Sequence, residues 1–386
     1  TRAFELVDRV SEWERFYITS HYHSDVTGNL EQQIEAYGVW KDTYPRDWIA
    51  PNNLADLYSD VGWFEEALVE ARIAHELEPD RAFPYTNMLP ALLALGRYEE
   101  AVAIVDEALG KGLLHWELFL TRFVVAYLAG DQATMEAQVE AVRGLPSELW
   151  LLNSQAAAAA SGGRMVEARE LMGKAVEASE RHGFDEQVAF LLAAGARREA
   201  AMGYIERARE LALEALDVSR NRESLPVAAM ALALAGATEQ ALQVIGELVT
   251  KNPTSTQVQD ASIPIAMAAV LLAEGDASGA IDRLEPAKPY QSRYLEALYM
   301  RGVAYLALEN PAAASAEFDQ LTALEGVEAT RPIHTLAHLG RARALAMTGL
   351  PAAAREAYDR FFARMEGSDP GLPVMREARA EYAGLE

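Results

Sequence analysis

Hydrophobic residues recur every three or four positions over most of this chain, the spacing that places them on one face of an α-helix. No segment shows the sustained alternation of apolar and polar residues that is typical of a half-buried strand. Stretches such as LLALGRYEEAVAIVDEAL combine an apolar helix, a glycine turn and a second helix with acidic residues near its start. The pattern therefore predicts an all-α protein built from helical hairpins.

The turn glycines are evenly spaced in the first part of the chain. Four of them follow one another at intervals of 34 residues: Gly28, Gly62, Gly96 and Gly130. Alanines recur five and twelve residues after two of these glycines: Ala67, Ala101, Ala74 and Ala108. Small side chains at a fixed phase let the two helices of a hairpin, and successive hairpins, approach closely. The spacing predicts a stack of helical repeats.

Beyond residue 130 the same unit continues with intervals of 33 to 40 residues. Its turns are predicted at Gly163, Gly203, Gly236, Gly275, Asn310 and Gly349. We expect ten hairpins, regular over residues 1–145 and looser over residues 146–386, with the extra residues in loops or helix ends. Because each hairpin leaves one apolar face uncovered, the stack needs caps. A first helix in residues 1–20 and a last helix over residues 374–382 are the candidates.

The repeat resembles the tetratricopeptide repeat (TPR) family. The second hairpin carries that family's pattern of asparagine, leucine, small, aromatic, glycine, alanine, alanine and proline at Asn53, Leu54, Ala55, Tyr58, Gly62, Ala67, Ala74 and Pro79. Ala71 departs from it, because an aromatic residue is usual there. The resemblance implies a right-handed α-solenoid in which the first helix of each hairpin lines a concave groove.

A closer resemblance covers nearly the whole chain. The opening RVSEWERFYITSHYHSDVTGNLEQQIEAYGVWKDTYPRDWIAPNNLADLYSDVGWFEEAL and the later HTLAHLGRARALAMTGLPAAAREAYDRFFARM are similar to the C-terminal TPR region of bacterial, acidobacterial-type serine/threonine protein kinases and winged-helix regulators. In that family the region follows a signalling domain, often beyond a membrane span. The kinase motifs themselves are missing from this sequence.

The composition of the chain limits the kinds of partner that it can bind. The net charge of −24 opposes binding to nucleic acid and to anionic lipid, and no apolar run is long enough to cross a bilayer. The chain contains no cysteine, which excludes disulfides and thiolate chemistry. It begins at Thr1 without a leader, so we expect a piece of a longer protein, either cytoplasmic or the extracytoplasmic part of a membrane-anchored one. A homodimer is compatible with these features.

The candidates for chemistry are weak. His21 and His23 point about 200° apart on a helix, so they cannot share one metal ion with Asp25. His334 and His338 share a helix face, but Thr335 stands where a metalloprotease helix has its general base and no third ligand is evident. The many carboxylates lie on exposed helix faces, and the serines lack a nucleophile elbow. We expect no catalytic residue, no metal and no cofactor.

The predicted groove positions lie 13, 10, 6 and 3 residues before each turn glycine. The candidate partner-binding residues at these positions are Tyr22, Asp25, Asn52, Asp56, Phe83, Thr86 and Tyr127, with Arg197 and Arg343 at the same phase further along. Aromatic, amide and acidic side chains together suit a peptide with apolar anchors and a basic residue. Pro90 interrupts one of the groove helices, where it either kinks the helix or adjusts the curvature of the stack.

Two functions remain open. The first is a non-catalytic scaffold that holds a protein or peptide in its groove as part of a larger signalling protein. The alternative is a small-molecule sensor in which the region from residue 146 onward closes around a ligand. A deep apolar pocket near Arg197 or Arg343 would favour the sensor, whereas a groove sealed by the chain itself would argue against the scaffold.

Overall fold

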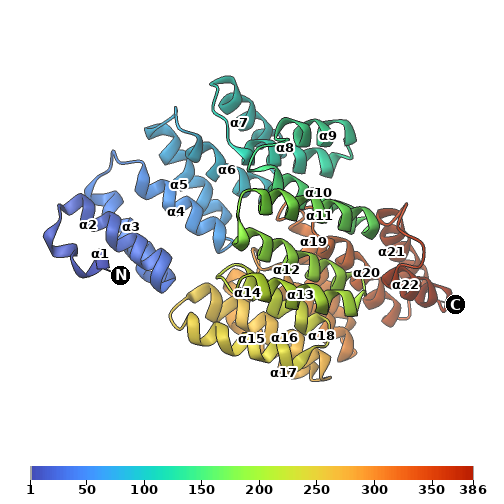
Figure 1. Ribbon diagram of the computed structural model, residues 1–386. Coiled ribbons are helices and arrows are strands. Elements are labelled where there is room, and N and C mark those ends of the chain that lie inside the picture. The colour runs from blue at the N-terminus through green and yellow to red at the C-terminus, as the bar shows by residue number, and fades with distance from the viewer. Residues whose placement is uncertain (1, 386) are drawn as a thin grey trace.

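The computed structural model describes residues 2–385, and within that range every regular element is helical (Figure 1). The helices are α1 (Arg2–Glu5), α2 (Glu12–Tyr22), α3 (Leu30–Thr43), α4 (Ile49–Asp60), α5 (Phe64–Leu77), α6 (Ala82–Ala94), α7 (Tyr98–Gly110), α8 (Trp116–Ala129), α9 (Gln132–Ala141), α10 (Glu148–Ser161), α11 (Met165–Arg181), α12 (Asp185–Ala201), α13 (Ile205–Val218), α14 (Ser224–Leu234), α15 (Thr238–Lys251), α16 (Ile263–Ala273), α17 (Ala277–Arg283), α18 (Leu295–Ala307), α19 (Pro311–Ala323), α20 (Pro332–Met347), α21 (Pro351–Arg364) and α22 (Pro373–Ala383). The prediction of an all-α protein is confirmed.

The helices from α2 to α21 pair into ten antiparallel hairpins, as the sequence predicted. The first helix of each pair carries an even number and the second an odd one. Nine of the ten turns contain a glycine at positive φ, for example Gly62 at 82° and Gly203 at 87°. A residue with a side chain is disfavoured in that conformation, so the periodic glycines follow from the geometry of the turn.

The ninth turn corrects the sequence assignment. Asn310 was expected in the glycine position, but the residue with the left-handed conformation is Glu309, at a φ of 55°. Asn310 instead caps α19, where its side chain accepts a hydrogen bond from the backbone N–H of Ala313. Asparagine is a favoured N-cap, so the residue that seemed to replace a turn glycine serves the next helix.

The two ends of the chain differ in how well they were predicted. The expected single helix over residues 1–20 is wrong: α1 is one turn long, a 3₁₀ turn follows at Val7–Arg9, and α2 begins afresh at Glu12. Ser11 and Glu14 form a capping box that starts α2 there. At the other end α22 confirms the predicted last helix and packs Met375 and Ala378 against the final hairpin. Thr1, the first residue of the expected N-terminal helix, and Glu386 lie outside the described range.

The extra residues of the later repeats lie largely within helices. The interval of 40 residues between Gly163 and Gly203 arises because α11 and α12 are each 17 residues long. The later interval from Gly236 to Gly275 contains a wide π-turn at Val258–Ser262 that leads into α16. Longer helices keep the hairpin geometry, so the stack continues without a break.

Successive coils of the solenoid touch one another. The backbone N–H of Thr256 donates to the carbonyl of Gly28 at 3.0 Å, and the indole of Trp63 donates to the carbonyl of Pro289 at 3.4 Å. Further along the contact between the same two coils, α20 packs against α10 and α12. Figure 1 shows α18 and α20 behind the green helices α12 and α13. The inner surface is therefore closed over part of its length by the chain's own second coil.

The alanines that set the repeat are predicted to tolerate no enlargement. Ala67 and Ala101 are completely buried at the contact between helices, so replacing either by leucine should lower the free energy of unfolding by about 1–3 kcal/mol through overpacking. Urea unfolding measures the change. Glu66→Lys, on the exposed side of the same helix, is the control and should change it by less than about 0.5 kcal/mol. Equal effects would contradict the assigned helix phase.

Candidate functional site

A cavity of about 470 Å³ lies on the inner surface of the first coil. Its walls come from the first helices α4, α6, α8, α10 and α12, which are consecutive around the coil. The remaining wall comes from Arg293 and from the segment 326–331 between α19 and α20. Val327 and Ala329 of that segment are buried, so the second coil roofs the cavity with packed residues. We call this space the wide cavity.

A row of aromatic side chains follows the helices along one side of the wide cavity. The rings of Trp116 and Trp150 stack at a centroid distance of 5.6 Å, and Trp150 lies 6.0 Å from Phe190. All three line the cavity and are only partly buried. Rigid aromatic surface of this kind is enriched where proteins bind partners, because it offers a large contact area at little conformational cost.

Carboxylates gather at the end of the wide cavity formed by α4 and α8. Asp56, Asp60 and Glu117 line it, and within residues 2–385 neither aspartate forms an ion pair. Both side chains are accessible to solvent, but protein atoms crowd around them and desolvate their carboxyl groups. Burial, together with the charges of Asp60 and Glu117, raises the pKa of Asp56 to about 7. Burial also raises the pKa values of Asp60 and Glu117.

The raised pKa of Asp56 predicts a stability that falls with pH. Its ordinary value is 3.8 and its folded value about 7, so the unfolded chain loses this proton first. The stabilising contribution is complete below pH 3.8 and is lost as the pH rises through about 7. Asp56→Asn should therefore reduce the fall in thermal stability between pH 5 and pH 8, measured by circular dichroism melting. A fall as steep as in the unchanged protein would contradict the assignment.

The control for this experiment is Asp131→Asn. Asp131 caps α9, and its hydrogen bonds to Thr134 hold the pKa of its carboxyl below the ordinary value. Its titration is complete below pH 5, so the substitution should leave the change between pH 5 and pH 8 as it is.

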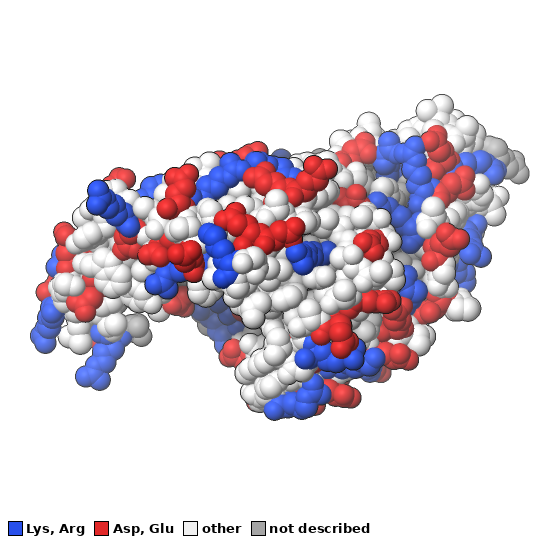
Figure 2. Space-filling model, turned by 90° about the horizontal axis from the view of Figure 1, so that it is seen from above, with Lys and Arg blue, Asp and Glu red and all other residues white. Residues whose placement is uncertain are grey.

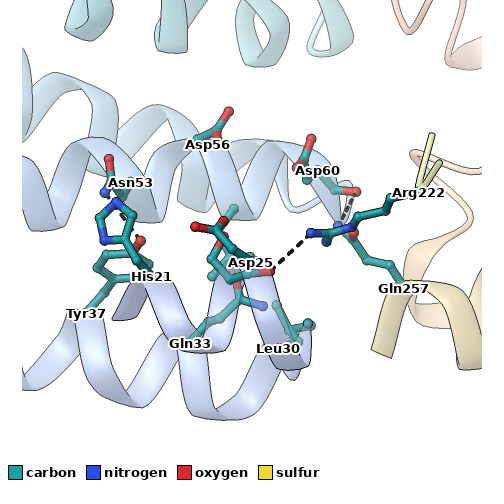
Figure 3. Close-up of a pocket in the computed structure, with 13 residues that line it drawn as sticks. His21, Asp25, Leu30, Gln33, Tyr37, Asn53, Asp56, Asp60, Arg222 and Gln257 are labelled. Carbon is teal, nitrogen blue, oxygen red and sulfur yellow. Dashed lines mark hydrogen bonds between the residues drawn. The ribbon is translucent and has the colours of Figure 1, made fainter. Parts of the chain in front are cut away.

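A second, polar cavity of about 230 Å³ adjoins Asp56 (Figure 3). The close-up shows Asp25 from the turn after α2, Asp56 and Asp60 from α4, and Arg222 reaching in from the loop before α14. Arg222 donates to the backbone carbonyl of Ser24 at 3.2 Å. Its charge lies near Asp60, so one cation faces a group of three carboxylates.

Arginines dominate the opposite end of the wide cavity. Arg197 on α12 lies 3.0 Å from Glu296 on α18, and Arg331 also pairs with Glu296 and with Glu328. Arg293 is 3.0 Å from Glu328. The wide cavity therefore has carboxylates on α4 and α8 and guanidinium groups on α12 and the second coil, and the charge of Arg293 also lies near Asp60.

Pro90 contributes a backbone group to the cavity. The helix α6 continues through it, and proline has no N–H to donate to the carbonyl four residues earlier, that of Thr86. Both residues line the wide cavity. The carbonyl of Thr86 is thus left without its helical donor beside the space where a ligand could supply one.

The structure brings only some of the predicted groove residues together. Asp56, Thr86 and Arg197 line the wide cavity, and Asp25 lines the polar cavity beside it. Five others lie away from the wide cavity: Tyr22, Asn52, Phe83, Tyr127 and Arg343.

Local contacts account for most of these five side chains. Tyr22 stacks on Phe4 at 3.9 Å, and Asn52 is buried and accepts a hydrogen bond from Asn87. Tyr127 packs into a small hydrophobic cluster. Arg343 is held by Glu381 of α22 at 2.8 Å, and only Phe83 remains largely exposed.

Several residues that line the wide cavity were missed by the sequence-based prediction, although the repeat spacing could have identified some of them. Trp150 and Asn153 stand 13 and 10 residues before Gly163, and Phe190 stands 13 before Gly203. Continuing the same count into the later hairpins would have found them. Arg293 and Glu328 carried no such signal, because they reach the cavity only when the second coil closes over the first.

The surface outside the cavities mixes charges of both signs. Figure 2 shows acidic and basic side chains interspersed over the face it displays. Most surface pairs are of the kind that contributes little to stability, such as Arg207 with Glu210 one helical turn apart. None of the helices in residues 2–385 is both long and apolar enough to span a bilayer.

Comparison with known proteins agrees with the repeat. The small glutamine-rich tetratricopeptide repeat-containing protein 2 of Mycosarcoma maydis is 34% identical over 80 residues, which is 21% of this chain and 22% of that protein. Over those 80 residues the chain is similar to a tetratricopeptide repeat protein. No family model matches it, and the closer resemblance to the region of bacterial kinases is not shown.

Solved structures show the same type of fold. The helical solenoid matches the APC/C hetero-tetramer Cut9–Hcn1 with a TM-score of 0.51 and 14% identity, over 99% of this chain and 65% of that one. Yeast Tom70 is covered to 96% at 13% identity, with a TM-score of only 0.39.

Proposed function

We propose that this chain is a non-catalytic scaffold that binds a segment of a partner protein in the wide cavity. The observation that carries the proposal is the joint position of the aromatic row and the unpaired carboxylates of Asp56 and Asp60 in one cavity. Crowding by protein atoms raises the pKa values of both carboxyls, and a cationic group supplied by a partner would favour their charged forms. Catalysis would need a nucleophile or an acid and base pair, and we assign neither here.

The chemistry of the cavity defines the partner segment. Apolar side chains would pack on Trp116, Trp150 and Phe190, and a lysine or arginine would lie between Asp56 and Asp60. The carbonyl of Thr86, freed by Pro90, can accept a backbone N–H of an extended segment. Such a segment must enter beneath the roof formed by residues 326–331, so a narrow, extended peptide fits better than a helix.

We further propose that the chain is the partner-docking region of a larger bacterial signalling protein. The resemblance of its first and last hairpins to the region that follows certain kinases and winged-helix regulators supports this role. In that arrangement the attached domain carries the activity, and the solenoid selects what it acts on.

Two peptide pools test the binding proposal. Each is a fluorescein-labelled set of nine-residue peptides with leucine at alternate positions, one with a central lysine and one with a central glutamate. Fluorescence polarisation should show binding of the lysine pool, and Asp56→Asn combined with Asp60→Asn should weaken it at least about tenfold, since hydrogen bonds to charged groups are being removed. In the same assay, Trp150→Ala should weaken peptide binding, because the aromatic row supplies the apolar contacts.

The matched control is Asp359→Asn on the exposed side of α21, which should leave binding unchanged. Equal binding of the glutamate pool, or unchanged binding by the double variant, would overturn the proposal.

A sensor remains the second candidate, and one observation favours it. Beside Arg197, between α12, α18 and α20, lies a further cavity of about 150 Å³ with mostly apolar walls. A pocket of that character near Arg197 is what a small-molecule site would require. We call it the narrow cavity.

A further inference from the structure

Arg198 on α12 is a buried cation without a carboxylate partner. Its side chain is 7% exposed, and its Nη1 donates to the amide oxygen of Asn153 at 2.9 Å. Within residues 2–385 its Nη2 has no hydrogen-bond acceptor, and no carboxylate lies within ion-pairing distance. A buried guanidinium is ordinarily paired, because leaving a charge unpaired away from water is costly.

The neighbouring carboxylates are already engaged by other cations. Glu199, the next residue, holds Arg169 through two hydrogen bonds of 2.7 and 2.8 Å. Glu296 pairs with Arg197 and Arg331, and Glu328 with Arg293 and Arg331. Three guanidinium groups thus share two carboxylates in this part of the interior, and Arg198 is a fourth. The region has an excess of positive charge, and Arg198 is the member left without a partner.

Burial and the charge of Arg197 lower the pKa of Arg198 to about 9. A shift in this direction means that the surroundings disfavour its positive charge. A bound anion would offset that penalty by stabilising the positive charge of Arg198, so the electrostatics of this region favour an anion.

The geometry supplies the space for such an anion. Arg198 lies where the wide and narrow cavities meet, and Ala157, Arg197 and Arg331 line both. Asn153 faces the wide cavity, and because its oxygen accepts from Arg198, its Nδ2 group is free to donate. Arg198 also lines this cavity, and its Nη2 has no partner among the described residues, so both residues offer a hydrogen-bond donor in the same part of the interior.

The narrow cavity indicates what the anion is attached to. Its walls include Leu234, Met300, Ile333 and Leu336. A cavity of about 150 Å³ with such walls holds a hydrocarbon group of roughly the size of benzene. A dianion such as phosphate would place charge against these apolar walls, whereas a carboxylate on a short hydrocarbon chain matches both the donors and the walls.

We propose that Arg198 and Asn153 bind the carboxylate of a short aliphatic acid whose hydrocarbon chain fills the narrow cavity. The same chemistry occurs in a free carboxylic acid and in the C-terminal residue of a peptide with an apolar side chain. The inference goes beyond the proposed scaffold, because it concerns the arginine end of the interior and holds whether or not a lysine-containing peptide binds at the acidic end.

Isothermal titration calorimetry with hexanoate and hexan-1-ol tests the site on the whole chain. Hexanoate should bind and raise the melting temperature, whereas the alcohol, equal in length but uncharged, should bind at least about tenfold more weakly. Acetyl-Gly-Gly-Leu with a free carboxylate, compared with its amide, distinguishes the two sources of carboxylate. Preference for the peptide acid over hexanoate assigns the site to a peptide terminus, and the reverse assigns it to a free acid.

Arg198→Met keeps the bulk of the side chain and should reduce hexanoate binding at least about tenfold. The control Arg207→Met removes an exposed arginine of the adjoining helix α13 and should leave binding unchanged. Equal binding of acid and alcohol to the unchanged protein, or unaltered binding by Arg198→Met, would overturn the proposal. The comparison of acid with alcohol decides the matter even if the variant fails to fold. It uses no lysine peptide, so its failure is separate from failure of the scaffold proposal.

Discussion

Replacing Glu296 by alanine should lower the free energy of unfolding by about 3–5 kcal/mol, the range seen when one partner of a buried ion pair is removed. Glu296 is 9% exposed and accepts hydrogen bonds from both Arg197 and Arg331. Without it, Arg197 loses its only ion pair in the described part of the chain. Two guanidinium groups would then face each other in an interior that already contains Arg198. Urea unfolding followed by circular dichroism measures the change.

Glu285→Ala is the matched control. Glu285 pairs with Lys288 at 2.7 Å, but both side chains are about half exposed, so its loss should cost less than about 1 kcal/mol. A similar loss for the two variants would mean that the interior cluster is hydrated and that the coils do not close over it.

Gly326→Ala should lower the free energy of unfolding by about 1–3 kcal/mol, and by more if the coil cannot relax. A β-carbon on Gly326 would lie 1.8 Å from the backbone carbonyl oxygen of Leu93. Neither side of this contact is a flexible side chain, so the segment 326–331 would have to move away from α6. Small-angle X-ray scattering should show a larger radius of gyration alongside the loss of stability.

Gly246→Ala controls for the loss of a glycine. Gly246 lies within α15 and nothing approaches the position of its β-carbon within 4 Å. Alanine is the better helix former, so this variant should be more stable by roughly 0.5–1 kcal/mol. If Gly326→Ala does not lower the free energy of unfolding, the two coils are not in contact in solution.

Both predictions concern the closure of the interior, which also decides how the scaffold works. The sequence predicted an open concave groove, but the roof formed by residues 326–331 closes part of that groove into a cavity. A partner segment must therefore thread into the solenoid or enter when the coils separate. Variants that loosen the roof should increase the association rate of the partner segment. Variants at Asp56 should instead change its dissociation rate.

The repeat itself could be predicted from the residues alone. Gly62 and Ala67 mark a hairpin because a left-handed turn and a close helix contact are local demands, and they recur wherever the hairpin recurs. The same locality explains the errors: Ser11 starts a new helix inside the expected cap, and Asn310 caps α19 while Glu309 occupies the turn.

The groove was predictable only in part. Asp56, Thr86 and Arg197 were found because their phase on the first helix of a hairpin is set by helix geometry. Asn52 and Arg343 also lie at predicted groove positions, but neighbours along the solenoid cover them, Asn87 in one case and Glu381 in the other.

The sequence by itself determined the hairpins, their number and the helix faces that turn inward, because each depends on residues within about 40 positions of one another. Only the tertiary structure decided that the interior is closed. The contacts responsible join residues more than 200 positions apart, such as Trp63 with Pro289 and Gly326 with Leu93. Whether two coils touch depends on the small rotations between successive hairpins, added over several repeats. No single segment of the sequence determines that total.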